Sequence, residues 1–405
     1  MALPYGLRAL RHRDYRLFWV GQLVSRVGTW MQSVAQAWLV LELTNSPLRL
    51  GLISTLQFSP VLLFAFLGGV VSDRVRKRRL IIATQVAMMF QALALAALVW
   101  SGHVQYWHVA VLAAMYGIAN SMDMPARQSY VVELTGKDDL MSAIALNSAV
   151  FNSARVVGPA LAGIFIARYG VAAAFLVNGV SFLAVLAALY AMRIEGAPHP
   201  RGKATIREEI VQGVTYATRT PHITLVLGLL LFVSLFVINF NVVVPLFARD
   251  VLGLGAHGFG LLMAALGVGA MFGALGVASI SLRRPSTTIV IIAAAAASVG
   301  VLGLSFVRSF ALAAAVLMAT GFAQIVFTSS ANSTVQVTVP DGMRGRMMSL
   351  YVVVFVGVTP VGAFLMGALS EKFGVATACA VGGSAGFVAV LALAGIWRRS
   401  RRVSS

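Results

Sequence analysis

The chain has 405 residues, of which 59% are hydrophobic and 11% charged, and its formal net charge is +18. Soluble globular chains carry about 45–50% apolar and roughly 25% charged residues, so this composition excludes a soluble globular domain. The single cysteine, Cys379, excludes an intrachain disulfide.

Long apolar blocks recur along the chain, and each can cross the hydrocarbon core as a helix of about 20 residues. In the first half they lie at residues 17–41, 49–71, 80–101, 105–123, 143–166 and 171–192. In the second half they lie at 222–246, 257–281, 286–306, 310–331, 348–370 and 374–397. None alternates as a membrane strand would, so we expect an all-α integral membrane protein of about twelve transmembrane helices.

The basic residues are distributed unevenly between the loops that these twelve spans define. Of 31 Lys and Arg, 24 lie on the side of the N-terminus, five on the other side and two within spans. This asymmetry follows the positive-inside rule and predicts a multi-pass cell-membrane protein with both termini in the cytoplasm. The excess of basic residues then serves to orient the protein in the membrane, and we expect no nucleic-acid partner. The apolar block that follows Met1–Arg16 is too long for a cleavable signal peptide, so we expect a retained first helix.

The first span carries a polar stripe on one helical face, because its polar residues recur at spacings of three and four. An arginine within a span is costly unless it faces a cavity or a partner, so the stripe predicts a substrate cavity. An ordinary interhelical hydrogen bond is the alternative for any single amide. The stripe consists of Gln22, Arg26, Thr29, Ser33 and Gln36.

The loop after the second span resembles the signature loop of the major facilitator superfamily. It places Gly69 four residues before Asp73 and Arg74, and a basic pair, Lys77 and Arg78, follows. The motif predicts a gate in which Gly69 allows close helix packing and Asp73 meets the positive end of the span that begins near Met347. The alternative is that the basic residues only fix the topology.

Acidic residues are absent from the middle of every span. Asp123 lies at the cytoplasmic end of the fourth span, with Arg127 nearby. Asp123 is therefore both the best candidate for carrying a proton and a candidate member of the Asp73 gate.

The fifth span contains two features. Asn152 and Arg155 share a helical face with Ser148 and are further cavity candidates. Gly158 and Pro159, followed by Gly163 and flanked by small residues, resemble the kinked motif of facilitator drug–proton antiporters. In that superfamily the motif accompanies exporters, whereas an ordinary packing kink is the alternative.

The chain divides into two halves that echo each other at an offset near 200–212 residues. We expect six-helix bundles at residues 1–193 and 221–405, with a cytoplasmic linker at 194–220. In the linker, Ile206–Tyr216 can form an amphipathic surface helix, but we favour a plain tether. Asn239 and Asn241 in the seventh span are also cavity candidates.

Three longer stretches resemble one branch of the superfamily, the enterobactin-exporter-like or transmembrane secretion effector facilitators. They begin at Leu10, Met122 and Val339. The resemblance implies the major facilitator fold, in which two six-helix bundles are related by a pseudo-two-fold axis. It also implies proton-driven export of a drug, a siderophore or another amphiphilic molecule by alternating access.

Two alternatives to an exporter remain at this point: an uptake permease on the same fold, and a membrane sensor that transports nothing. The sequence has no nucleotide-binding, metal-ligand or nucleophile motif, so we expect neither an enzyme nor a metal or organic cofactor. We expect a monomer whose partners are the lipid bilayer and a small-molecule substrate.

Overall fold

The computed structural model describes residues 5–197, 206–279 and 286–403, and within these ranges it contains helices, turns and bends but no strand. The chain forms two compact units. Unit 1 comprises residues 1–45, 56–202 and 255–264, and unit 2 comprises 46–55, 203–254 and 265–405.

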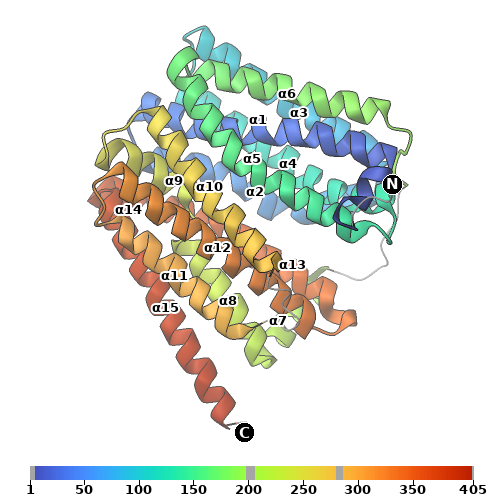
Figure 1. Ribbon diagram of the computed structural model, residues 1–405, viewed down its shortest axis with the longest axis vertical. Helices are drawn as coiled ribbons and strands as arrows, with labels where there is room; N and C mark the ends of the chain where they lie inside the picture. Colours follow the sequence, from blue (N-terminus) through green and yellow to red (C-terminus); the bar gives the residue numbers. More distant parts are fainter. Residues whose placement is uncertain (1–4, 198–205, 280–285, 404–405) are drawn as a thin grey trace. The chain divides into compact units, whose positions relative to one another are not determined.

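Unit 1 is built from long helices that pack side by side (Figure 1). Helix α1 packs on α5 and α6, and α3 packs on α4 and α6. Helices α5 and α6 are joined by Gly170 alone, whose φ of 81° requires a residue without a Cβ. The elements are η1 (Tyr5–Arg11), α1 (Arg13–Thr44), α2 (Pro47–Arg74), α3 (Lys77–Trp100), α4 (Tyr106–Thr135), α5 (Leu140–Tyr169) and α6 (Val171–Ala191).

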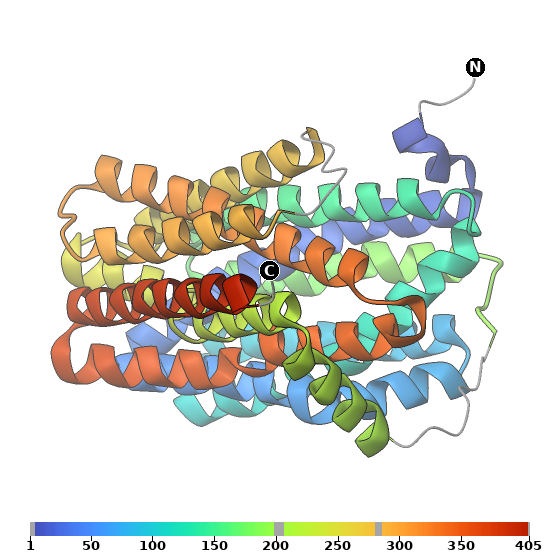
Figure 2. The ribbon, with the colours of Figure 1, turned by 90° about the horizontal axis from the view of Figure 1, so that it is seen from below.

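In unit 2, α15 packs against α8, α11 and α14 (Figure 2), and its last turns extend past these neighbours (Figure 1). The elements are α7 (Ile206–Arg219), α8 (Pro221–Phe236), α9 (Phe240–Leu246), η2 (Phe247–Val251), α10 (Ala256–Ser279), α11 (Thr287–Leu304), α12 (Phe310–Thr338), α13 (Asp341–Gly357), α14 (Thr359–Phe373) and α15 (Val375–Val403).

Two helices begin in one compact unit and continue in the other. The first turns of α2 pack in unit 2, where a Cβ at Gly51 would lie 2.6 Å from the carbonyl oxygen of Ala363 in α14. The first turns of α10 pack in unit 1, where a Cβ at Gly260 would lie 2.5 Å from the carbonyl oxygen of Pro159 in α5. Glycine is required at both crossings because the backbones approach so closely.

Two of the expected spans are interrupted rather than continuous. The span expected at 222–246 breaks after α8, where the side-chain amide of Asn239 donates to the carbonyl oxygen of Leu235 at 2.8 Å and competes with the helical backbone. The span expected at 348–370 breaks at Val358, just before Pro360, which has no N–H to donate. Each segment still forms one candidate membrane span, Pro221–Val251 and Met343–Phe373, and the break within it is the feature that the sequence did not predict.

Ten helical segments of the described residues are long and apolar enough to cross a membrane. Helices α1 and α4 are also long, at 32 and 30 residues, but they do not meet the same criterion of length and hydropathy. Both carry several charged and polar side chains. Helices α1 and α4 therefore supply charged and polar side chains from which a functional site in unit 1 could be built.

The linker is not the plain tether that we favoured, because α7 occupies Ile206–Arg219. This helix packs on α8 and α13 within unit 2. The two compact units separate between residues 202 and 203, just before α7.

The short helix η1 docks on the start of α5. The backbone N–H of Ala9 donates to Ser142 Oγ at 3.0 Å, and Ser142 Oγ donates to the carbonyl oxygen of Gly6 at 2.9 Å. Asp139 pairs with His12 at 2.8 Å and with Arg11 at 2.8 Å. The hydrogen bond from His12 and the charge of Arg11 hold the pKa of Asp139 below its ordinary value.

This docking is expected to weaken in acid. A carboxyl group whose pKa is lowered by folding contributes stability above its ordinary pKa of 3.8, and that contribution is lost as the pH falls through the lowered value. Hydrogen exchange at Ala9 and its neighbours, corrected for intrinsic rates, should accelerate on acidification. Asp139→Asn should show fast exchange already at neutral pH. Equal protection in the variant and the parent at neutral pH would contradict the prediction.

Candidate functional site

A small polar cavity lies inside unit 1, between α1, α3, α4 and α6. Its volume is ≈ 10 Å³, about the space that one ordered water needs. Charged and amide side chains supply most of its wall. The cavity is lined by Gln22, Ser25, Arg26, Thr29, Gln85, Met88, Tyr116, Asn120, Asp123, Arg127 and Phe182.

Asp123 of α4 is the most densely bonded side chain of this cavity. One carboxylate oxygen accepts from Thr84 Oγ1 at 2.8 Å and from Gln85 Nε2 at 3.0 Å, both on α3. The other forms an ion pair with Arg127, one helical turn further along α4. The two side chains of this pair are only 3% and 8% exposed. The two donors from α3 fix that helix to α4, whereas the ion pair with Arg127 lies within α4.

Arg26 of α1 adds a second positive charge to the same cavity. It lies within electrostatic range of both Asp123, which attracts it, and Arg127, which repels it. The sequence predicted that Arg26 lines a substrate cavity and that Asp123 and Arg127 belong to a gate. The structure places the three in one cavity wall.

The rest of the α1 stripe divides into two groups. Gln22 and Thr29 line the cavity with Arg26. Ser33 does not line it and donates instead to the carbonyl oxygen of Thr29 at 3.3 Å within its own helix. Gln36 also lies apart, because its amide donates to Gln57 Oε1 at 2.7 Å and links α1 to α2.

A buried amide network beside the stripe escaped the sequence analysis. Gln32 Nε2 donates to Gln91 Oε1 at 2.8 Å, and Asn178 Nδ2 donates to Gln32 Oε1 at 2.6 Å. The three amides join α1, α3 and α6. The available signal was that Gln91 and Asn178 are polar residues within apolar spans, where an amide is costly unless it is hydrogen-bonded.

The α5 candidates lie outside this cavity. Arg155 is buried, with its guanidinium 5.9 Å from the centroid of the Trp30 ring of α1. Asn152 donates to the carbonyl oxygen of Ser148 at 2.9 Å. Among the described residues, Asn152 Oδ1 has no hydrogen-bond partner.

Asn239 and Asn241 belong to unit 2. Asn239 is 3% exposed and lies at the break between α8 and α9, where a Cβ on Gly362 of α14 would come within 2.8 Å of its Oδ1. Asn241 follows it in α9 and is half-buried. Asn239 therefore has a local role in shaping the break of the helix.

The small residues around Gly158 and Pro159 in α5 pack closely against two neighbouring helices, α1 and α10. A Cβ at Gly158 would lie 2.9 Å from the carbonyl oxygen of Val27 in α1. A Cβ at Gly163 would lie 3.0 Å from the carbonyl oxygen of His257, in the first turn of α10. These small residues hold α5 between α1 and the start of α10.

Replacing Gly163 by valine should therefore destabilise unit 1. The added side chain meets backbone atoms of His257, which cannot rotate away, and overpacking of this kind costs about 1–3 kcal/mol. Thermal unfolding in detergent measures the loss. Gly395→Val in α15 is the matched control, because nothing lies within 4 Å of a Cβ at Gly395. Equal melting temperatures for the two variants would refute the packing role.

The loop after α2 is only partly described, because the surroundings of Gly69 and the side chain of Asp73 lie outside what the structure describes. The Asp73 gate therefore stays a prediction. Arg74 is exposed. Lys77, at the start of α3, is 3% exposed and pairs with Glu133 of α4 at 2.6 Å. Lys77 is thus a buried structural residue rather than a surface charge.

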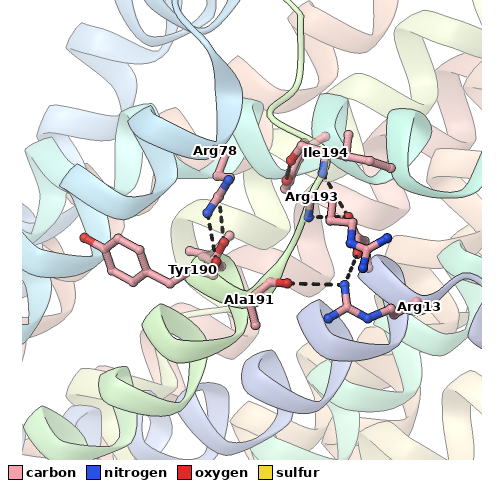
Figure 3. A network of polar contacts seen from close by, with 9 residues as sticks. Arg13, Arg78, Tyr190, Ala191, Arg193 and Ile194 are labelled. Carbon is pink, nitrogen blue, oxygen red and sulfur yellow. Dashed lines mark hydrogen bonds and ion pairs between the residues drawn. The ribbon is translucent and has the colours of Figure 1, made fainter.

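Residues 192–197 run across the ends of these helices, and we call them the strap. Arg78 donates to the carbonyl oxygens of Leu189 and Tyr190 at 2.6 and 3.0 Å (Figure 3). Asp14 accepts from the backbone N–H groups of Arg193 and Ile194 at 2.8 and 2.9 Å. The end of α6 is in this way tied to α3, and the strap is tied to α1.

Comparisons with known proteins agree on one class. Residues 5–402 match the family model described as "Transmembrane secretion effector". The chain is 26% identical to the multidrug efflux pump Tap of Mycolicibacterium fortuitum, over 87% of this chain and 88% of that protein. It is 24% identical to the enterobactin exporter EntS of Salmonella typhi, over 92% and 89%. It is 22% identical to the staphyloferrin A transporter of Staphylococcus aureus, over 89% and 90%.

Solved structures show the same fold at lower identity. A POT family transporter aligns over 97% of both chains with a TM-score of 0.74 and 11% identity. The nucleoside transporter NupG aligns over 95% of this chain and 99% of its own, with a TM-score of 0.73 and 12% identity. The described residues contain no group of three or more His, Cys, Asp or Glu side chains that could hold a metal ion.

Proposed function

Because the chain belongs to the transmembrane secretion effector family of major facilitator transporters, we propose that it exports a small amphiphilic molecule, such as a drug or a siderophore, from the cell. Export proceeds by alternating access of the two halves to a central cavity and is driven by proton influx. The protein works as a monomer in the cell membrane, with both termini in the cytoplasm.

The observation that carries this proposal is the polar cavity of unit 1. A half-buried arginine, Arg26, and a buried ion pair meet inside a bundle of membrane helices, where charge is costly and marks a transport pathway by default. The names of two relatives support export as the direction, since they are a multidrug efflux pump and an enterobactin exporter. The name of a third, the staphyloferrin A transporter, supports transport without stating a direction.

Among the described residues, Asp123 is the only acidic one that lines this cavity, but we propose that it orders the arginines rather than carries the proton. Three donors already stabilise its carboxylate. Proton coupling is tested separately, by imposing a pH gradient on liposomes that contain the purified protein.

The loop that includes Asp73 supplies the gate in this proposal. Asp73→Asn should leave insertion and protein level intact but cripple turnover, because the neutral amide is not attracted to the positive end of a helix as the carboxylate is. Normal export by this variant at the parental protein level would refute the gate.

A susceptibility screen in an efflux-deficient host, with and without the protein, tests export directly. Expression should raise resistance to some amphiphilic compounds and lower their accumulation. Raised accumulation would indicate an uptake permease instead. If no compound is affected and liposomes move none under any ion gradient, the chain is not a transporter of this class.

A further inference from the structure

The cavity of unit 1 carries an excess of positive charge. Its lining contains three charged side chains: Arg26, Asp123 and Arg127. Asp123 pairs with Arg127, so one positive charge, that of Arg26, has no acidic side chain of its own in the cavity wall. The cavity is therefore suited to a negatively charged group.

Arg26 is also short of hydrogen-bond acceptors. A guanidinium carries five N–H donors. Among the described residues, no hydrogen bond or ion pair joins Arg26 to a neighbour, although Asp123 and Arg127 lie within electrostatic range. The carboxylate that could have paired with Arg26 already accepts from Thr84, Gln85 and Arg127.

A guanidinium in the middle of a membrane helix is unfavourable unless an anion compensates its charge. We propose that the cavity of unit 1 binds an anionic oxygen group, a carboxylate or a phenolate, of the exported molecule, and that Arg26 is its main ligand. This proposal rests on the proposed function, because it names the chemical class of the exporter's substrate.

The size of the cavity limits what enters it. A volume of ≈ 10 Å³ accommodates about one oxygen atom, the size of a water molecule, so in this proposal one anionic oxygen enters and the rest of the molecule lies outside. Gln85 Oε1 is buried without a hydrogen-bond partner among the described residues. Gln85, which also lines the cavity, therefore has an acceptor that no described residue satisfies.

The positive charge of the cavity also determines which ligand groups bind there. A cationic group at this position meets the excess positive charge of Arg26, whereas a neutral amide of the same shape gains no ionic hydrogen bond. Charge-assisted hydrogen bonds are roughly twice as strong as neutral ones. A carboxylate should consequently bind about tenfold or more tightly than the corresponding amide.

Binding of 1-naphthoate and of its neutral amide, 1-naphthamide, to the purified full-length protein tests the proposal. Equilibrium dialysis in detergent should show at least a roughly tenfold preference for naphthoate. Arg26→Gln should abolish that preference, and Arg26→Lys should keep part of it. Arg308→Gln is the control, because Arg308 is exposed and bonds only backbone carbonyls of its own loop.

Equal affinity for the two probes, no binding of naphthoate, or an undiminished preference in Arg26→Gln would overturn the proposal. The export screen decides the other question independently. Export without a naphthoate preference would refute the anion site and leave the exporter standing. A naphthoate preference without any export would refute the exporter and leave an anion-binding membrane protein.

Discussion

Replacing Asp123 by asparagine is expected to lower the free energy of unfolding of unit 1 by about 3–5 kcal/mol. The variant keeps the size of the side chain but removes the negative charge that faces Arg127 and Arg26. Arg127 is 7% exposed, so water cannot compensate for the lost partner. Removing one member of a buried ion pair leaves an uncompensated charge, which is the most damaging kind of polar substitution.

Thermal unfolding of the purified protein in detergent measures this effect, and the midpoint should fall by on the order of 10 °C. Asp250→Asn is the matched control. Asp250 also pairs with an arginine, Arg249, but the two side chains are 37% and 24% exposed, and exposed pairs contribute about 0–1 kcal/mol. If the two substitutions shift the midpoint equally, the Asp123 pair is not a buried structural element.

The double variant Asp123→Asn with Arg127→Gln separates charge from packing. Removing both charges should recover part of the lost stability, because neither partner is then left alone. Arg26 remains charged in this variant, so recovery should be incomplete. Full recovery would indicate that Arg26 does not belong to the same electrostatic unit.

The sequence was sufficient to predict the membrane class and the approximate spans, because long apolar blocks report directly on what a bilayer requires. The interruptions at Asn239 and Val358 were not predicted. Hydropathy is insensitive to them, since the broken segments stay apolar: Phe240–Leu246 contains a single polar residue. A side-chain bond to Leu235 and a proline decide the breaks locally.

The α1 stripe shows what the helical spacing of polar residues can predict and what it cannot. The spacing correctly placed Gln22, Arg26 and Thr29 on a shared face of one helix, and these three residues line the cavity together. Periodicity cannot identify the helix opposite that face. Asp123 lies 97 positions along the chain from Arg26, and only the packing of α1 beside α4 brings them together.

Lys77 is a residue whose structural role the sequence could not predict. Within a run of basic residues at a span end, it is indistinguishable from lysines that merely fix topology. Its role depends on Glu133, at the far end of another helix, and on the strap. No local pattern signals a pairing of that kind, and the neighbouring Arg79 is exposed.

Replacing Lys77 by methionine is expected to destabilise unit 1 by about 3 kcal/mol and to release the strap. Lys77 Nζ pairs with Glu133 Oε1 at 2.6 Å and also donates to the carbonyl oxygen of Ala197. Glu133 Oε2 in turn accepts from the backbone N–H of Ala197 at 2.9 Å. Methionine fills a similar volume, so the loss reports on polar contacts rather than on a cavity.

Limited trypsin digestion detects the release, because cleavage after Arg193 requires the strap to leave the helix ends. Cleavage at this site should accelerate in Lys77→Met and stay at the parental rate in Arg79→Met, whose side chain is exposed in the same first turn of α3. Unchanged cleavage in Lys77→Met would show that Asp14 and the backbone N–H of Arg78, which donates to the carbonyl oxygen of Glu195 at 3.1 Å, hold the strap without Lys77. In a double-mutant cycle with Glu133→Gln, the coupling between Lys77 and Glu133 should exceed about 1 kcal/mol, the upper range for an exposed pair.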